Sequence, residues 1–190
     1  MELILLRHAK TAGNLVKRYI GKTDEKLAPE GVAEASALVD RTIGRVYVSP
    51  LRRAVETAEI RFPGAELVIC EDLREMDFGD FEGLSANEMA ENPAYLAWVE
   101  ENCEPAPPGA SEDFAAYSER VCRAIAGLVK NETERVVAVT HGGAIMAAMS
   151  RWAKPERAYY LWNPPHCGGY AAEIGDDWDG SGDFISWRKL

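Results

Sequence analysis

The sequence predicts an α/β fold, a three-layer sandwich with a mostly parallel central sheet. Two apolar runs, residues 3–6 and 136–140, lack the polar alternation of a half-exposed strand, so both are expected to be covered on two faces. Segments with apolar residues at helical spacing lie between the expected strands. Alternating strands and helices favour a parallel sheet with helices on both faces.

Two further strands and four helices complete the expected framework. The strands are expected at 45–49 and 66–70, and the helices at 29–43, 49–60, 111–131 and 142–153. Pro29 suits the first turn of its helix. Ser49 is expected to cap the next helix, and Ser111, followed by two acidic residues, suits the start of the third.

The length of 190 residues predicts one domain covering residues 1–190. Residues 76–110 are expected to form an acidic helical insertion at the C-terminal edge of the sheet. The stretch from Glu75 to Glu119 contains twelve acidic residues and no Lys or Arg, which sets this part of the chain apart from the rest.

Charge and cysteine usage narrow the classes of partner and compartment. The net charge of −10 argues against binding to nucleic acid or to an anionic membrane. No stretch approaches the ~18 apolar residues of a membrane span, and the N-terminus does not have the pattern of a signal peptide. The four cysteines form no CxxC pair, so we expect reduced thiols and a cytoplasmic location.

Polar side chains that suit an anion follow three of the expected strands. Arg7 and His8 follow the first strand, His141 and Gly142 follow the strand at 136–140, and a turn after 45–49 leads to Arg52. Ligands of α/β sheets gather beyond the carboxyl ends of the strands. Arginines bind phosphate through paired hydrogen bonds, and a helix N-terminus beside His141 favours an anion. The sequence therefore predicts a phosphate site.

Other phosphate chemistries lack their residues. No cysteine is followed six residues later by arginine, and no GxxxxGK[ST] loop is present. Only three histidines are available for a dinuclear metal site. The acidic segment "DDWDGS" (176–181) superficially resembles an aspartate-nucleophile or calcium loop, but it is interpreted as a surface turn. A histidine is then the remaining nucleophile.

Five motifs in order resemble one known family. The segment "RHAKTAGN" (7–14), with the following "YIGKTDEKLAPEG", is similar to an RHGxTxxN motif and its continuation, and "SPLRRAVETA" (49–58) to SPLxRAxxTA. "LREMDFGDFEG" (73–83), "PPGASEDF" and "VTHGG" are similar to three further motifs. The chain thus resembles the histidine phosphatase superfamily, in its phosphoglycerate-mutase-like branch, over nearly its whole length.

The resemblance implies a role for each matching residue. His8 is expected to be the nucleophile and Glu75 the proton donor. Phosphate binding is expected from Arg7, Asn14, Arg52, His141 and Gly142, and substrate binding from Gly21 and Thr23. Tyr95 and Trp98 are added as substrate-binding candidates because they are aromatic residues of the insertion on which a leaving group could stack. The implied enzyme is a phosphomonoesterase that forms phosphohistidine and uses no metal or cofactor, with residues 76–110 as a lid over the active site.

Several of these assignments have alternatives in the sequence. Arg53 stands beside Arg52, which could instead be a solvated helix residue, and Asn14 could be only a turn cap. Glu75 competes with other acids of the same loop, Asp77, Asp80 and Glu82. His166 is interpreted as a structural residue or part of the pocket rim.

The substrate is a small phosphate ester whose identity the motifs leave open. The acidic, aromatic insertion favours a neutral or aromatic leaving group, and the length and "PPGASEDF" loop resemble alpha-ribazole phosphatases. A broad small-molecule phosphatase has the same architecture and is the other candidate. A phosphoglycerate mutase is the alternative enzyme. A non-catalytic phosphate-binding relative is a second alternative, because Ala9 stands where the family motif has glycine. Homodimerisation is left open.

Overall fold

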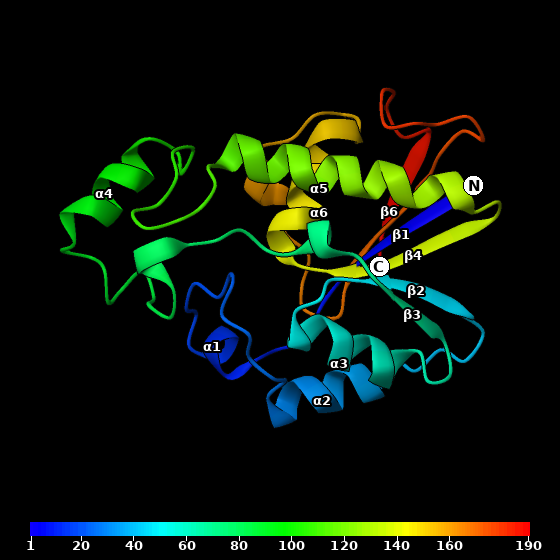
Figure 1. Ribbon diagram of the computed structural model, residues 1–190, viewed down its shortest axis with the longest axis horizontal. Helices are drawn as coiled ribbons and strands as arrows, with labels where there is room; N and C mark the ends of the chain where they lie inside the picture. Colours follow the sequence, from blue (N-terminus) through cyan, green and yellow to red (C-terminus); the bar gives the residue numbers. More distant parts are fainter.

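Parallel strands with helices on both sides form the core of the computed structural model, which describes residues 1–190, for Asn131 without its side chain (Figure 1). One sheet has six strands in the order β3-β2-β4-β1-β5-β6. Pairing is parallel from β3 to β1, whereas β5 is antiparallel to β1 and β6. The strands are β1 (Glu2–Arg7), β2 (Arg45–Val48), β3 (Glu66–Ile69), β4 (Arg135–Thr140), β5 (Gly169–Glu173) and β6 (Ser186–Lys189). The predicted fold class is confirmed.

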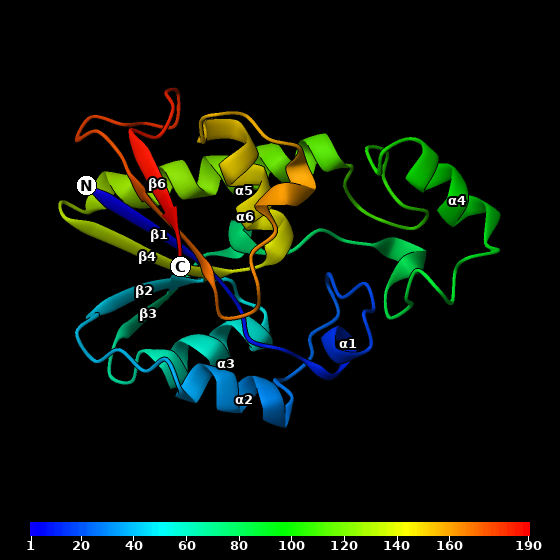
Figure 2. The same cartoon turned by 180° about the vertical axis from the view of Figure 1, so that it is seen from behind.

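Helices cover the two faces of this sheet. Figures 1 and 2 show α5 and α6 on one face and α2 and α3 on the other. The α-helices are α1 (Ala12–Leu15), α2 (Pro29–Ser36), α3 (Arg52–Arg61), α4 (Pro93–Glu100), α5 (Phe114–Leu128) and α6 (Gly142–Trp152), and the short 3₁₀ helix η4 covers Tyr159–Trp162.

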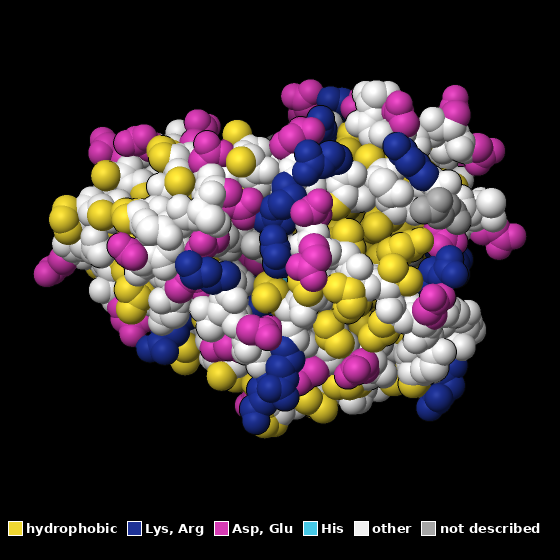
Figure 3. Space-filling model, viewed as in Figure 1, with side chains coloured by type: hydrophobic (Ala, Val, Ile, Leu, Met, Phe, Trp, Pro, Cys, Tyr) yellow, Lys and Arg dark blue, Asp and Glu magenta, His cyan; other side chains and the backbone are white. Residues whose placement is uncertain are grey.

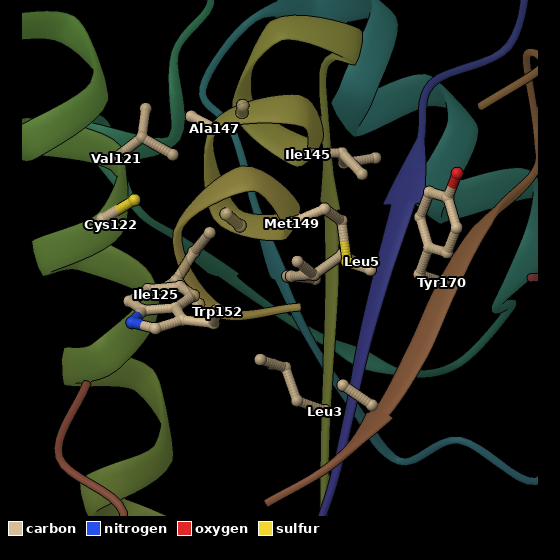
Figure 4. Close-up of a cluster of buried hydrophobic side chains, with 14 of the residues drawn as sticks. Leu3, Leu5, Val121, Cys122, Ile125, Ile145, Ala147, Met149, Trp152 and Tyr170 are labelled. Atoms are coloured by element: carbon tan, nitrogen blue, oxygen red, sulfur yellow. The ribbon is translucent and has the colours of Figure 1, made fainter. Parts of the chain in front are cut away.

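Burial on both faces explains why β1 and β4 lack polar alternation. Leu3 and Leu5 pack with Ile125 of α5 and Met149 of α6 (Figure 4). Leu6 and other residues facing the opposite side pack in a second cluster with α3. Because successive strand residues face opposite sides, a strand covered on both sides requires apolar residues throughout.

Three helix boundaries differ from the sequence prediction. The helix expected over 29–43 ends at Ser36, and Asp40 accepts a hydrogen bond from the backbone of Thr42 in the turn that follows. The helix expected from Ser49 begins at Arg52, because the hydroxyl of Ser49 is hydrogen-bonded to a histidine ring instead. Asp113, and not Ser111, caps α5.

Residues 76–110 pass through α4 beyond the edge at which β1 and β4 end (Figure 1). Four aromatic or thioether side chains form the core of this segment: Phe81, Met89, Tyr95 and Trp98. They pack with Tyr19 from the N-terminal part of the chain, so the segment is tied to the remainder by apolar contacts.

The surface is mixed in charge. Acidic and basic side chains are interspersed over the face drawn in Figure 3. Within the described part of the chain, no helix combines the length and apolar composition needed to cross a bilayer.

Candidate active site

His8 lies directly after β1 and is almost fully buried. Its backbone N–H donates to the carbonyl of Thr140 in β4 at 2.9 Å, which holds it beside the end of the neighbouring strand. Its Nδ1 is 2.7 Å from the carbonyl oxygen of Ala9. Because a carbonyl oxygen only accepts, Nδ1 carries the proton and Nε2 presents a lone pair.

The surroundings keep the His8 ring neutral. Burial, followed by the positive charge of Arg53 and by His166 and Arg7, places the pKa of His8 well below its usual value of about 6.5. Neutral imidazole is the nucleophilic form of histidine.

His141 follows β4 and occupies the N-cap position of α6. Its ring is fully buried, and its centroid is 5.2 Å from that of His8. Nε2 is 2.7 Å from Oγ of Ser49, whereas Nδ1 is buried without a hydrogen-bond partner among the described residues. Burial and the nearby Arg53 lower the pKa of His141 well below the usual value.

Arg7, the last residue of β1, is held by the segment that follows η4. Its Nη1 donates to Oδ1 of Asn163 at 3.0 Å and to the carbonyl of Pro164 at 2.9 Å. Its Nε is buried without a partner among the described residues, so this N–H remains available to a ligand.

Arg53, and not the predicted Arg52, lies among the catalytic candidates. Arg52 is 57% exposed and pairs with Glu56 one helical turn away, which removes it from the site. Arg53 is fully buried, and its positive charge lowers the pKa of both His8 and His141. The assignment of Arg52 is therefore corrected to Arg53. The motif SPLxRAxxTA already contains this signal, since its arginine is the fifth residue and Arg53 is the fifth residue of "SPLRRAVETA".

Backbone carbonyls hold the Arg53 guanidinium in place. Nη1 donates to the carbonyl of Thr23 at 2.8 Å, and Nη2 donates to those of Gly21 and Ile20 at 2.8 and 3.2 Å. Nε has no partner among the described residues. Gly21 and Thr23, predicted to bind substrate, thus contact an arginine of the site, and neither lines the cavity described below.

Glu82 organises the loop that carries these carbonyls. Its carboxylate accepts hydrogen bonds from the backbone N–H groups of Gly21 and Thr23 and from the Thr23 hydroxyl, the last at 2.6 Å. A Cβ at Gly21 would lie 1.9 Å from the carbonyl oxygen of Met76, so only glycine allows this close approach. Glu82 therefore positions the loop, and Glu75 is the one of the two carboxylates that lines the cavity described below.

Glu75 lies on the cavity wall, where three donors hold its carboxylate. Oε1 accepts the backbone N–H of Met76 at 3.0 Å and a short hydrogen bond from the Tyr117 hydroxyl, and Oε2 accepts the N–H of Gly143 at 3.1 Å. A Cβ at Gly143 would lie 2.4 Å from Oε1, so the close contact between α6 and Glu75 requires glycine. Burial beside Glu75 raises the pKa of Tyr117 well above its usual value, which keeps its hydroxyl protonated as a donor.

One cavity of about 230 Å³ is lined by Arg7, His8 and Glu75, whereas Arg53 and His141 are not among its lining residues. Six predicted site residues line it: Arg7, His8, Asn14, Glu75, Trp98 and Gly142. Asn14 also completes a reciprocal cap of α1 with Thr11, as the alternative interpretation expects. Tyr95 is buried in the cluster of the 76–110 segment, where its hydroxyl is 3.0 Å from that of Tyr19, so it supports the wall from behind.

The third histidine supports His8 from the other side. The ring of His166 is 5.4 Å from that of His8, and its Nδ1 is 3.1 Å from the His8 carbonyl oxygen. Burial and the nearby Arg7 lower the pKa of His166 to about 4, so this ring is also neutral near pH 7. Among the described residues, no group of His, Cys, Asp or Glu side chains is arranged to hold a metal ion.

Comparison with known proteins gives this arrangement a family. A family model described as "Histidine phosphatase superfamily (branch 1)" matches residues 3–177. The chain belongs to the histidine phosphatase superfamily. A metal-independent phosphoserine phosphatase from Arabidopsis thaliana is 32% identical over 174 residues, which cover 85% of this chain and 73% of that protein. A glucosyl-3-phosphoglycerate phosphatase from Mycobacterium tuberculosis is 34% identical, with 98% and 91% coverage.

Solved structures of this superfamily have the same fold. An alpha-ribazole phosphatase from Shigella flexneri superposes with a TM-score of 0.79 at 27% identity, covering 92% of this chain and 91% of that one. A phosphoserine phosphatase variant from Entamoeba histolytica, bound to phosphoserine, gives a TM-score of 0.81 at 25% identity, with 98% and 95% coverage. The protein is accordingly a phosphatase of the histidine phosphatase type.

Sequence reasoning missed most of the wall of this histidine phosphatase. Beyond Trp98, the aromatic residues at the cavity are Tyr19, Phe78, Phe114, Tyr117, Tyr159 and Tyr160. They come from four separate segments of the chain, and scattered aromatics carry no spacing that indicates a shared pocket. Tyr117 is the one of these residues that the sequence could have indicated, because it lies on the apolar face of a helix that the sequence predicts.

Proposed function

We propose that this histidine phosphatase is a metal-independent phosphomonoesterase in which His8 becomes phosphorylated. The observation that carries the proposal is a group of unpaired nitrogen atoms at one site. Nε of Arg7, Nε of Arg53 and Nδ1 of His141 are buried without partners among the described residues, and Nε2 of the nearby His8 ring is unprotonated. Buried donors without partners are costly, and a bound phosphoryl group would satisfy them.

In the proposed first step, Nε2 of His8 forms a bond to phosphorus as the ester P–O bond breaks. Arg7, Arg53 and His141 stabilise the charge on the phosphoryl oxygens, and the N-terminus of α6 adds a favourable dipole. Protonated Glu75 donates its proton to the departing oxygen. Its carboxylate then takes a proton from water, whose oxygen bonds to phosphorus as the N–P bond breaks and inorganic phosphate leaves.

The cavity wall supports an ester with an apolar or aromatic leaving group. Trp98 and Phe78 come from residues 76–110, which we propose act as a lid, and Tyr159 comes from η4 on the other side. Among the described residues of the wall, Arg18 is the basic side chain besides Arg7, and Glu88 already pairs with it at 3.0 Å. A leaving group with a carboxylate therefore lacks a free cation, and an ester of the alpha-ribazole 5′-phosphate kind fits better.

Turnover by the purified full chain tests both parts of this proposal. We expect full activity in EDTA, and a higher kcat/KM for alpha-ribazole 5′-phosphate than for phosphoserine or 3-phosphoglycerate. Rapid acid-free quenching should trap acid-labile phosphate on the wild-type protein and none on His8→Ala. Loss of activity in EDTA, or full activity of His8→Ala, would contradict the mechanism. A preference for phosphoserine would contradict only the assignment of the leaving group.

p-Nitrophenyl phosphate separates an enzyme from a protein that only binds phosphate. Its phenolate leaves without needing a proton, so formation of the phosphohistidine from this ester depends on His8 and the phosphate-binding groups and not on a proton donor. A chain that binds inorganic phosphate but does not hydrolyse this ester would be a non-catalytic relative.

A further inference from the structure

The buried hydrogen bond between Ser49 and His141 sets the direction of a proton at the active site. Ser49 lies after β2 and is fully buried, as is His141. Oγ and Nε2 are 2.7 Å apart, and either atom could donate. The choice matters, because a neutral imidazole has one N–H and must leave its other nitrogen as an acceptor.

Hydrogen-bond accounting decides this direction. Oγ of Ser49 accepts a hydrogen bond from the backbone N–H of Leu51 at 3.4 Å. Among the described residues, Nε2 of His141 is the acceptor within reach of the Ser49 hydroxyl proton. If Nε2 were the donor, both this buried hydroxyl proton and the Nδ1 lone pair would lack partners, whereas with Ser49 as the donor only the Nδ1–H does. Each buried polar group without a partner costs about 1–3 kcal/mol. Ser49 therefore donates to Nε2, and the single ring proton of His141 is on Nδ1.

We propose that Ser49 is a positioning residue that fixes His141 as the Nδ1–H tautomer, so that Nδ1 donates to a phosphoryl oxygen. Nδ1 is the ring nitrogen that the described part of the protein leaves without a partner. In the opposite tautomer a lone pair would meet the anion and repel it. The expected effect on phosphate binding and turnover rests on the proposed function. The tautomer itself is a property of the free protein.

Electrostatics make the tautomer decisive. Burial is the largest cause of the lowered pKa of His141, and the nearby Arg53, His8 and Arg7 lower it further. The ring is therefore held in its neutral form. A doubly protonated ring would donate from both nitrogens, and Ser49 would then not matter. With a neutral ring, the hydroxyl of Ser49 selects which nitrogen faces the substrate.

Nitrogen-15 NMR of the histidine rings measures the tautomer directly, because protonated and unprotonated ring nitrogens have well-separated shifts. The chain has three histidines, so single His→Gln variants assign every signal. We expect wild-type His141 to show a protonated Nδ1 and an unprotonated Nε2 near pH 7.5. In Ser49→Ala we expect the proton to move wholly or partly to Nε2, and in Ser49→Thr, which keeps the hydroxyl, to stay on Nδ1.

A matched control removes a neighbouring buried hydroxyl with no bond to the ring. Thr140 of β4 is fully buried, and its Oγ1 donates to the carbonyl of Leu73 at 2.8 Å. Thr140→Val should lose stability comparably to Ser49→Ala and keep the wild-type tautomer. A tautomer change in both variants would indicate a general loss of packing and would overturn the proposal.

Binding and turnover test the consequence separately. Affinity for inorganic phosphate should fall about tenfold in Ser49→Ala, and kcat for p-nitrophenyl phosphate about 10²-fold, the usual effect of losing one oxyanion donor. A protonated Nε2 in the wild type, or an unchanged tautomer in Ser49→Ala, overturns the proposal. A wild-type protein with the Nδ1–H tautomer and no turnover would instead refute the proposed function and leave the role of Ser49 in the free protein intact.

Discussion

Arg52 and Arg53 are neighbours in α3 with opposite surroundings. Arg53 is fully buried and its guanidinium donates hydrogen bonds to three backbone carbonyls, whereas Arg52 is exposed and pairs with Glu56.

Substitution of each arginine in turn provides a matched test. We expect Arg53→Gln to lower kcat/KM for p-nitrophenyl phosphate by about 10²–10³-fold, since it removes a buried charge from the phosphate site. Arg52→Gln should change stability by less than ~0.5 kcal/mol and leave turnover at the wild-type level. Equal losses in the two variants would contradict the assignment.

The loss of rate on substitution of Glu75 should increase with the basicity of the leaving group. Glu75→Gln is expected to lower kcat for an alkyl phosphate by about 10²–10⁴-fold, because the alkoxide needs a proton. The loss should be much smaller for formation of the phosphohistidine from p-nitrophenyl phosphate, measured as the burst of p-nitrophenolate. The same loss for both esters would show that Glu75 acts on folding or binding and not as a proton donor.

Tyr117 should position Glu75 without donating a proton itself. Its hydroxyl is a permanent donor to Oε1 of Glu75, because its pKa is raised well above the usual value. We expect Tyr117→Phe to lower kcat for alkyl phosphates about 10-fold, which corresponds to one hydrogen bond to a charged group. The limb of the pH–rate profile on which activity falls with rising pH should shift in this variant, because a general acid loses its function on deprotonation. An unchanged profile would limit Tyr117 to packing.

Glu82 should act on the site through the loop at residues 20–23. Glu82→Gln loses part of the set of hydrogen bonds that the carboxylate accepts, so we expect about 2 kcal/mol of destabilisation and a higher KM through a less firmly held Arg53. Denaturant unfolding and steady-state kinetics measure the two effects. Glu91→Gln, at an exposed acid of the same segment, is the control and should behave as wild type. A wild-type KM in Glu82→Gln would show that the loop at residues 20–23 does not affect phosphate binding.

Three neutral histidines, of which His8 and His141 are buried and His166 is half-buried, should make the protein sensitive to mild acid. The pKa of His166 is lowered to about 4, and those of His8 and His141 are also lowered. Below about pH 6.5 the unfolded chain binds protons that the folded one does not, so the free energy of unfolding falls as pH falls, by up to about 1.4 kcal/mol per pH unit for each histidine. For His166 this window extends down to about pH 4.

His166→Gln isolates one of these contributions. Denaturant unfolding between about pH 6.5 and about pH 4.5 should give a slope up to ~1.4 kcal/mol per pH unit shallower than in the wild type. Glutamine does not titrate, and its amide can still donate to the His8 carbonyl. Identical slopes would show that His166 is protonated in the folded protein.

Local sequence patterns were sufficient for the framework of the fold. Continuous apolar runs identify β1 and β4 because both strands are covered on two faces. β5 and β6 were not predicted: "GYAAE" and "SWRK" are short, and their strand character comes from the pairing of β5 with β1 and of β6 with β5. Helix starts were wrong where Ser49 and Ser111 use their hydroxyls on tertiary partners, which no local capping pattern records.

The sequence by itself determined which residues follow the strands, and therefore that Arg7, His8 and His141 meet at one edge of the sheet, since this needs only strand order and direction. Only the tertiary structure decided between neighbours of like chemistry. Each residue turns the helix by about 100°, so packing of α3 against the sheet selects Arg53 over Arg52. Glu75 and Glu82 belong to one irregular loop without periodicity, and their partners, Tyr117 in α5 and the loop at 20–23, are distant in the chain. Long-range contacts of this kind assign one carboxylate to the cavity and the other to the support of Arg53.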